Sequence, residues 1–202
     1  TGMTGWGTHG QSEGIWSDDG NMTLCLAQSI GETGGIRTHD IMERFLEGLN
    51  PNGNGSLIRI YVNIAARLLA GTDKEAAVQE GVSTSVGWYR RHEKFEEALP
   101  VWEPLLDTVS LAEKPEREIG SSGYVVDTLI ASLWCLLTTD SYRECLLKAV
   151  NLGEDTDTTG AVAGGLAGLV YGYGGIPRDW LDALKGKTVI EKACEAMERG
   201  ES

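Results

Sequence analysis

The sequence predicts an all-α protein folded as a single compact multi-helix domain. Apolar residues recur at helical spacing along nearly the whole chain, and no convincing alternating strand pattern appears. At 202 residues the chain has the size of one domain with a substantial core. Hydrophobic residues make up 41% and charged residues 23%, which is ordinary for a globular protein. We therefore expect one domain over residues 1–202.

The first half of the chain is expected to contain five helices. Ser17 is a suitable N-cap for a helix over 18–30. Apolar residues on one face predict a second helix over 40–49. Residues 50–56 contain proline, glycine and asparagine and are interpreted as a loop. An apolar helix should follow this loop, and two more exposed helices should follow that one; these three are expected over 57–70, 74–86 and 94–112.

The second half is expected to be more apolar. The glycine-containing segment 120–123 should break the chain before an apolar helix over 124–137, and another helix is expected over 141–150. Glycine recurs at every fourth position of the following helix, which predicts a buried central helix that a neighbour approaches closely. This helix, a short one that begins at a proline and the last one are expected over 157–173, 177–184 and 188–199.

Charge and cysteine usage limit the class of protein. The formal net charge of −13 argues against nucleic acid as a partner, because phosphate binding needs a basic face. The apolar segment 160–172 is too short to span a membrane. Four scattered cysteines without C-x-x-C spacing are interpreted as reduced core thiols of a cytoplasmic protein. They are Cys25, Cys135, Cys145 and Cys194.

Two short acidic clusters are the most informative features of the chain. The first is Trp16-Ser17-Asp18-Asp19 and the second is Gly153-Glu-Asp-Thr-Asp-Thr-Thr-Gly160. Both fall at expected helix starts, where Ser, Thr and Asp commonly cap the helix. Capping needs one such residue rather than four in succession, and neighbouring carboxylates repel each other unless a cation neutralises them. Oxygen ligands without His or Cys favour Mg²⁺, Mn²⁺ or Ca²⁺, and two clusters suit two ions about 3.5–4 Å apart.

Four blocks of sequence, in order along the chain, resemble the ADP-ribosylglycohydrolase family, which includes the dinitrogenase reductase-activating glycohydrolases. The blocks are Trp16-Ser17-Asp18-Asp19 with Met22-Thr23-Leu24, then Gly53-Asn54-Gly55-Ser56-Leu57-Ile58-Arg59, then Gly123-Tyr124-Val125-Val126-Asp127-Thr128-Leu129, and finally the second acidic cluster. The resemblance covers nearly the whole chain.

The resemblance implies an all-α fold and a metal-dependent hydrolase that releases ADP-ribose from a modified protein side chain or a related compound. Its partner would be ADP-ribose or an ADP-ribosylated protein, and nucleic acid would bind only as an ADP-ribosylated substrate. The implied ligands of two Mg²⁺ or Mn²⁺ ions are Ser17, Asp18, Asp19, Asp155, Asp157 and Thr158. Loss of Asp18 or Asp19 is expected to abolish activity through loss of an ion. The implied substrate contacts are Gly53, Asn54, Gly55 and Ser56 at the pyrophosphate, and Gly123 and Tyr124 at the adenosine side.

The chain also departs from the family pattern. Gly20 stands where the family has Thr or Ser, and the family's N-terminal segment and two internal segments, near 49–52 and 60–61, have no counterpart. Either the sequence omits these segments or it belongs to a shortened homologue. Two alternatives to the hydrolase therefore stay open: a catalytically impaired ADP-ribose-binding pseudoenzyme, and a crystallin-like structural homologue.

Overall fold

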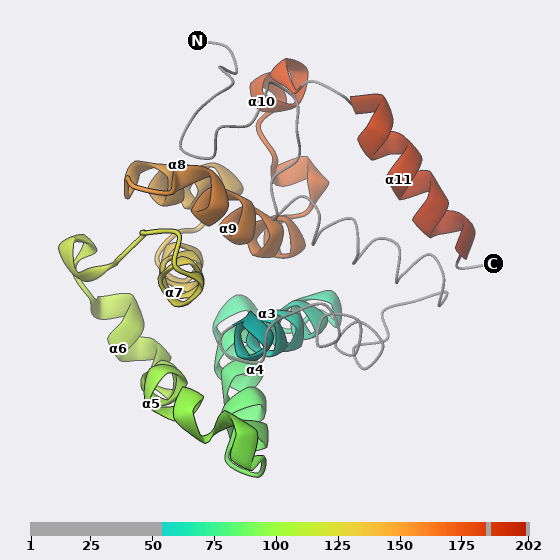
Figure 1. The fold of residues 1–202 in the computed structure, drawn as a ribbon. Coiled ribbons are helices and arrows are strands. Elements are labelled where there is room, and N and C mark those ends of the chain that lie inside the picture. The colour runs from blue at the N-terminus through green and yellow to red at the C-terminus, as the bar shows by residue number, and fades with distance from the viewer. Residues whose placement is uncertain (1–53, 185–186, 201–202) are drawn as a thin grey trace, which may run out of the picture. The chain divides into compact units, whose positions relative to one another are not determined.

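The computed structural model describes residues 54–184 and 187–200, and within these ranges the chain forms helices and no strand (Figure 1). The all-α class is thus confirmed. The elements are α3 (Asn54–Leu69), α4 (Lys74–Tyr89), η1 (Glu93–Ala98), α5 (Leu99–Trp102), η2 (Glu103–Leu106), α6 (Thr108–Glu113), η3 (Glu116–Glu118), α7 (Val125–Leu137), α8 (Tyr142–Asn151), α9 (Thr156–Tyr171), η4 (Tyr173–Gly175), α10 (Arg178–Ala183) and α11 (Lys187–Gly200). The chain divides into two units, and of the smaller one the structure describes only residues 188–200, within α11. The expected helices over 18–30 and 40–49 lie outside the described residues.

Two sequence predictions about local structure are wrong. The single helix expected over 94–112 is instead a series of short turns, η1, α5, η2 and α6. Pro100 and Pro104 stand in the first turns of α5 and η2, and a proline inside a continuing helix would remove a hydrogen bond and clash with the preceding turn. The loop expected over 50–56 is wrong at residues 54–56, which form the first turn of α3.

Helices α3 and α4 form an antiparallel pair. The guanidinium carbon of Arg59, near the start of α3, lies 3.7 Å from the centre of the Trp88 ring, near the end of α4. Toward the other end of the pair, Arg67 Nε donates to Glu80 Oε2 at 3.2 Å. The contacts therefore run in opposite order along the two helices. The α3 helix continues without a break through residues 60–61, where the sequence suggests a missing family segment.

Helix α9 packs against α8, α7 and α3. Its glycine stripe faces α8, because a Cβ built at Gly160 would lie 3.2 Å from Val150 and one at Gly164 would lie 3.3 Å from Leu146. On another face, Gly165 adjoins the hydroxyl of Tyr61 on α3. The close helix approach expected from the stripe is thus confirmed at two of its four glycines.

The cysteine prediction is only partly correct. Cys135 on α7 and Cys145 on α8 are buried, free thiols, and burial raises the pKa of the Cys135 thiol to about 12. Both therefore behave as small apolar core residues. Cys194, in contrast, is exposed on α11, so its assignment to the core is wrong. Cys25 lies outside the described residues.

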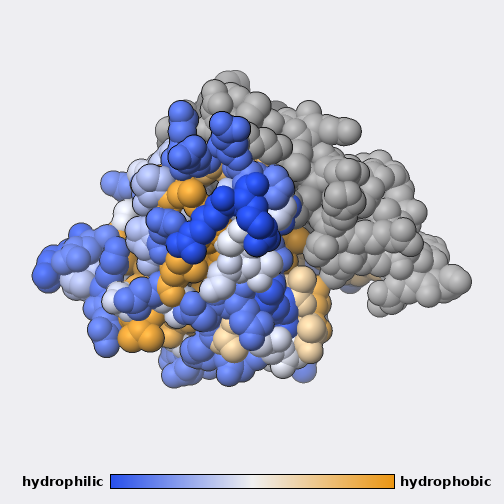
Figure 2. Space-filling model, turned by 90° about the horizontal axis from the view of Figure 1, so that it is seen from below, coloured by the Kyte–Doolittle hydropathy of each residue, from blue (hydrophilic) through white to orange (hydrophobic). Residues whose placement is uncertain are grey.

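Surface properties agree with the ordinary composition of the chain. On the face in Figure 2, hydrophilic residues predominate and hydrophobic residues are exposed in small groups between them. None of the described helices combines the length and apolar character needed to cross a bilayer.

The tightest contact between α3 and α4 gives a stability prediction. A Cβ at the buried Gly81 would lie 2.9 Å from the backbone N and 3.0 Å from the Cα of Ile64. Because these are backbone atoms, the two helices would have to separate to remove the overlap. We expect Gly81→Ala to lower the free energy of unfolding by about 1–3 kcal/mol. Gly87, on the same helix, has no neighbouring atom within 4 Å of a built Cβ. Gly87→Ala should therefore raise the free energy of unfolding by up to about 1 kcal/mol, because alanine has the higher helix propensity. Denaturant titration of the two variants measures both effects, and equal destabilisation would contradict this account.

Candidate metal and ligand site

The segment before α7 and the turn before α9 are joined by two hydrogen bonds. The backbone N–H of Asp155 donates to the Ser121 carbonyl oxygen at 3.0 Å. In the other direction, the Ser121 hydroxyl donates to the Gly153 carbonyl oxygen, also at 3.0 Å. Ser121 is only 3% exposed, so both bonds are shielded from water. The starts of α7 and α9 are consequently held side by side.

The Asp155 carboxylate lies directly against Gly123. A Cβ built at Gly123 would overlap Asp155 Oδ2 and lie 3.0 Å from both Cβ and Cγ of that aspartate. Gly123 also has a φ of +76°, a conformation that favours glycine. The structure therefore brings together two residues that the sequence assigned to different parts of the site, one to the metals and one to the ligand.

Asp155 is the N-cap of α9, as the capping interpretation predicted, but its cap is long. Its Oδ1 accepts from the Thr158 N–H at 3.3 Å, whereas Asp73 and Asp107 accept at 2.9 Å at the starts of α4 and α6. Hydrogen bonds weaken as they lengthen beyond about 3.2 Å. The capping hydrogen bond is therefore weaker at Asp155 than at the other two aspartates, and it explains the position of this carboxylate less well.

The other predicted ligands of the second cluster occupy the first turn of α9. Asp157 is exposed and Thr158 is half-buried. Both therefore remain reachable from the surface at the end of the helix where Asp155 lies.

The turn that leads into Asp155 has an unusual backbone. Gly153 has a φ of +88° and Glu154 a φ of +56°, so two successive residues are left-handed. Only Glu154 carries a Cβ, and the left-handed conformation costs a residue of this kind about 1–2 kcal/mol. Strain of this type is found preferentially at functional sites.

The start of α7 forms the facing wall. Tyr124 is the N-cap residue of α7 and is 60% exposed, so it is not the core residue that its place before an apolar helix might suggest. Ser122 Oγ donates to Asp127 Oδ2 at 2.7 Å and accepts from the Tyr124 N–H at 3.3 Å. Sequence reasoning did not single out Ser121 or Ser122. Their only signal was a pair of hydroxyl residues just before a glycine and a helix start.

The predicted ligands form only part of a metal site within the described residues. Ser17, Asp18 and Asp19 lie outside them, and within residues 54–184 and 187–200 no three His, Cys, Asp or Glu side chains come close enough to hold an ion. The donors that are described are two carboxylates and a hydroxyl, a set that suits a hard cation such as Mg²⁺ or Mn²⁺. The partial positive charge of a helix N-terminus opposes a cation there, so further carboxylates are needed.

The predicted pyrophosphate segment is described only in part. Gly53 lies outside the described residues, whereas Asn54, Gly55 and Ser56 begin α3. Amide groups in the first turn of a helix have no acceptor within the helix, and they bind phosphate groups well. The correction from loop to helix thus leaves the expected chemistry of this segment intact.

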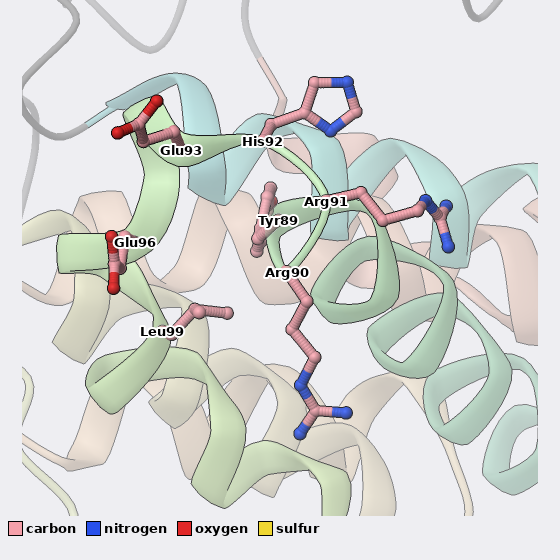
Figure 3. Close-up of a pocket in the computed structure, with 7 residues that line it drawn as sticks. All are labelled: Tyr89, Arg90, Arg91, His92, Glu93, Glu96 and Leu99. Atoms are coloured by element: carbon pink, nitrogen blue, oxygen red, sulfur yellow. The ribbon is translucent and has the colours of Figure 1, made fainter.

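A hollow of about 390 Å³ lies elsewhere, beside the end of α4 (Figure 3). Its lining residues are Tyr89, Arg90, Arg91, His92, Glu93, Glu96 and Leu99. None of the sequence-predicted site residues is among them. Arg90 already pairs with Glu103 at 2.9 Å, and in Figure 3 Arg90 and Arg91 extend in different directions. This hollow therefore lacks a set of converging polar groups.

The described residues form an all-α protein in which acidic and hydroxyl side chains gather at the starts of α7 and α9. The family model for ADP-ribosylglycohydrolase matches residues 51–202, and the chain belongs to this family. The chain is 28% identical to the ADP-ribosylarginine hydrolase Tri1 of Serratia proteamaculans, in an alignment that covers 96% of this chain and 70% of the relative.

Two further similarities agree with the family. The chain is 49% identical to the ADP-ribosyl-[dinitrogen reductase] glycohydrolase of Rhodospirillum rubrum over 71 residues, which are 35% of this chain and 24% of the relative. A solved structure described as an ADP-ribosylglycohydrolase-related protein complex matches with a TM-score of 0.52 and 28% identity. That match covers 98% of this chain and 86% of the other. Family and relatives together support an ADP-ribosyl hydrolase activity.

The left-handed Glu154 gives a prediction that separates backbone strain from charge. Glu154→Gly should be about 1 kcal/mol more stable than Glu154→Ala, because both remove the carboxylate but only glycine adopts this φ at little cost. Thermal and denaturant unfolding of the two variants measures the difference. Equal stability would show that the turn is not strained.

Proposed function

We propose that this chain is a metal-dependent hydrolase that removes ADP-ribose from a modified protein side chain or from a related ADP-ribosyl compound. The observation that carries the proposal is the position of the Asp155 carboxylate, fitted against Gly123 at the joint start of α7 and α9. Family membership and the activities in the relatives' names support the same reaction. One relative is named for ADP-ribosylarginine, which makes a modified arginine the first substrate to test.

The proposed ligands of two Mg²⁺ or Mn²⁺ ions are the six residues predicted from the sequence: Ser17, Asp18, Asp19, Asp155, Asp157 and Thr158. Bound there, the ions would supply Lewis-acid polarisation and orient the distal ribose and a water molecule. The six proposed ligands would all bind the ions through hard oxygen atoms.

The remaining proposed contacts are made by the chain itself. The N–H groups of Gly53, Asn54, Gly55 and Ser56 would bind the pyrophosphate, since the first turn of α3 offers unpaired donors. The exposed ring of Tyr124 would provide a flat apolar surface for the adenosine, beside Gly123. Binding at these two ends would fix the distal ribose relative to the acidic cluster, which is the positioning that hydrolysis needs.

A binding protein without turnover is the second candidate, and it is favoured by internal residues of a relative that have no counterpart here. The alignment with the Serratia relative spans 256 residues although this chain has 202, so the relative contains residues without a counterpart here. This supports the proposal that residues 1–202 form one family domain that lacks internal segments of the relative. Binding of ADP-ribose without hydrolysis would identify such a protein.

Asparagine at position 155 tests the hydrolase. Asn caps helices about as well as Asp, so Asp155→Asn should keep α9 intact while removing one ligand charge. We expect hydrolysis of ADP-ribosylarginine to fall by on the order of 100-fold or more, and chelation of the wild-type protein to have the same effect. Asp107→Asn is the matched control, because Asp107 caps α6 in the same way and should not affect activity. Full activity of Asp155→Asn, or of the chelated wild type, would contradict the metal-dependent reaction.

A further inference from the structure

Thr128 on α7 is a buried polar residue whose hydroxyl has no hydrogen-bond partner. The residue is 2% exposed, and its Oγ1 makes no bond with any other atom of the described chain. Buried hydroxyls in proteins are nearly always paired, because an unpaired one loses its bonds to water without replacement. The neighbouring hydroxyls follow this rule: Ser132 donates to the Thr128 carbonyl oxygen at 2.7 Å, and Thr159 donates to the Asp155 carbonyl oxygen at 2.9 Å.

The register between α7 and α9 places Thr128 beside the acidic cluster. Gly123, just before α7, lies against Asp155, just before α9. Further along both helices, Ser132 Oγ on α7 lies 3.4 Å from the Thr159 carbonyl oxygen on α9. The two helices therefore run in the same direction from a common start. Thr128 is one turn before Ser132 on the same face, so it faces the first turn of α9 rather than the bulk of the core.

We propose that Thr128 is a positioning residue of the metal centre, and that its hydroxyl bonds to an oxygen atom of the bound cation's ligand shell on the α7 side. This inference rests on the proposed function. Three observations converge on it: the unpaired hydroxyl, its register with the first turn of α9, and the long cap at Asp155. A partner that arrives with the cation explains why a hydroxyl is kept where valine would fit.

The inference predicts opposite effects on stability and on metal binding. Thr128→Val keeps the shape of the side chain and removes the hydroxyl. In metal-free protein the variant should melt at the same temperature as wild type or higher, because no hydrogen bond is lost. Mn²⁺ affinity, measured by calorimetric titration without substrate, should fall by about tenfold, as is typical when a group behind a metal ligand is removed.

Two control variants make the result specific. Thr128→Ser restores the hydroxyl and should recover most of the Mn²⁺ affinity. Ser132→Ala, one turn further along α7, removes a paired hydroxyl. This control should lower the melting temperature of the metal-free protein and leave Mn²⁺ affinity unchanged.

The possible failures can be told apart. If wild type binds Mn²⁺ and Thr128→Val binds it equally well, the hydroxyl is only a packing defect and the inference is overturned while the proposed function stands. A marked loss of stability in metal-free Thr128→Val would also overturn it, by showing that the hydroxyl is already bonded. If wild type itself binds no Mn²⁺, the metal-dependent function fails and this inference fails with it.

Discussion

The contact between the Asp155 carboxylate and Gly123 is the constraint on which the candidate site depends. Two helices begin at this point, and the carboxylate occupies the space that any other residue at position 123 would fill. The two hydrogen bonds of Ser121 join the same two chain segments. The carboxylate thus has its place fixed by backbone contacts, which restrict its motion more than flexible side chains would. This is the preorganisation that a ligand-binding group requires.

The position of α9 is in turn set by small residues. Gly160 and Gly164 allow α8 to approach on one side, and Gly165 accommodates the Tyr61 hydroxyl on another. At its far end, the Tyr171 hydroxyl donates to the Thr139 carbonyl oxygen at 2.8 Å. A helix packed so closely has little freedom to slide or rotate, since displacement would create overlap on one side and a gap on the other. The first turn of α9, which carries the acidic residues, is therefore held in place as well.

The sequence predicted the long apolar helices well, because their signal is local. The helices expected over 124–137, 141–150 and 157–173 are found with ends that differ by one or two residues. The sequence-based prediction failed where two local signals conflicted. Prolines interrupt the helix expected over 94–112. Helix α3 begins at Asn54 although glycine and asparagine at its start favour a loop. In the site, Asp155 could be named from its motif. Its contact with Gly123 and the role of Ser121 arise only from packing between segments that are distant in sequence.

The observed capping role of Asp155 and its proposed role as a cation ligand have opposing electrostatic requirements. As an N-cap, its carboxylate favours the positive end of α9, and this attraction holds it close to the helix. As a cation ligand, it must direct negative charge away from the helix, toward an ion that the same positive end repels. The 3.3 Å cap leaves the carboxylate less tightly bound to the helix end than the 2.9 Å caps of α4 and α6. Asp157 offsets part of the helix charge, but two carboxylates only balance the charge of a divalent ion and leave none to offset the helix end. A cation site at this position therefore depends on carboxylates from a second segment, which is the part that Asp18 and Asp19 are proposed to play.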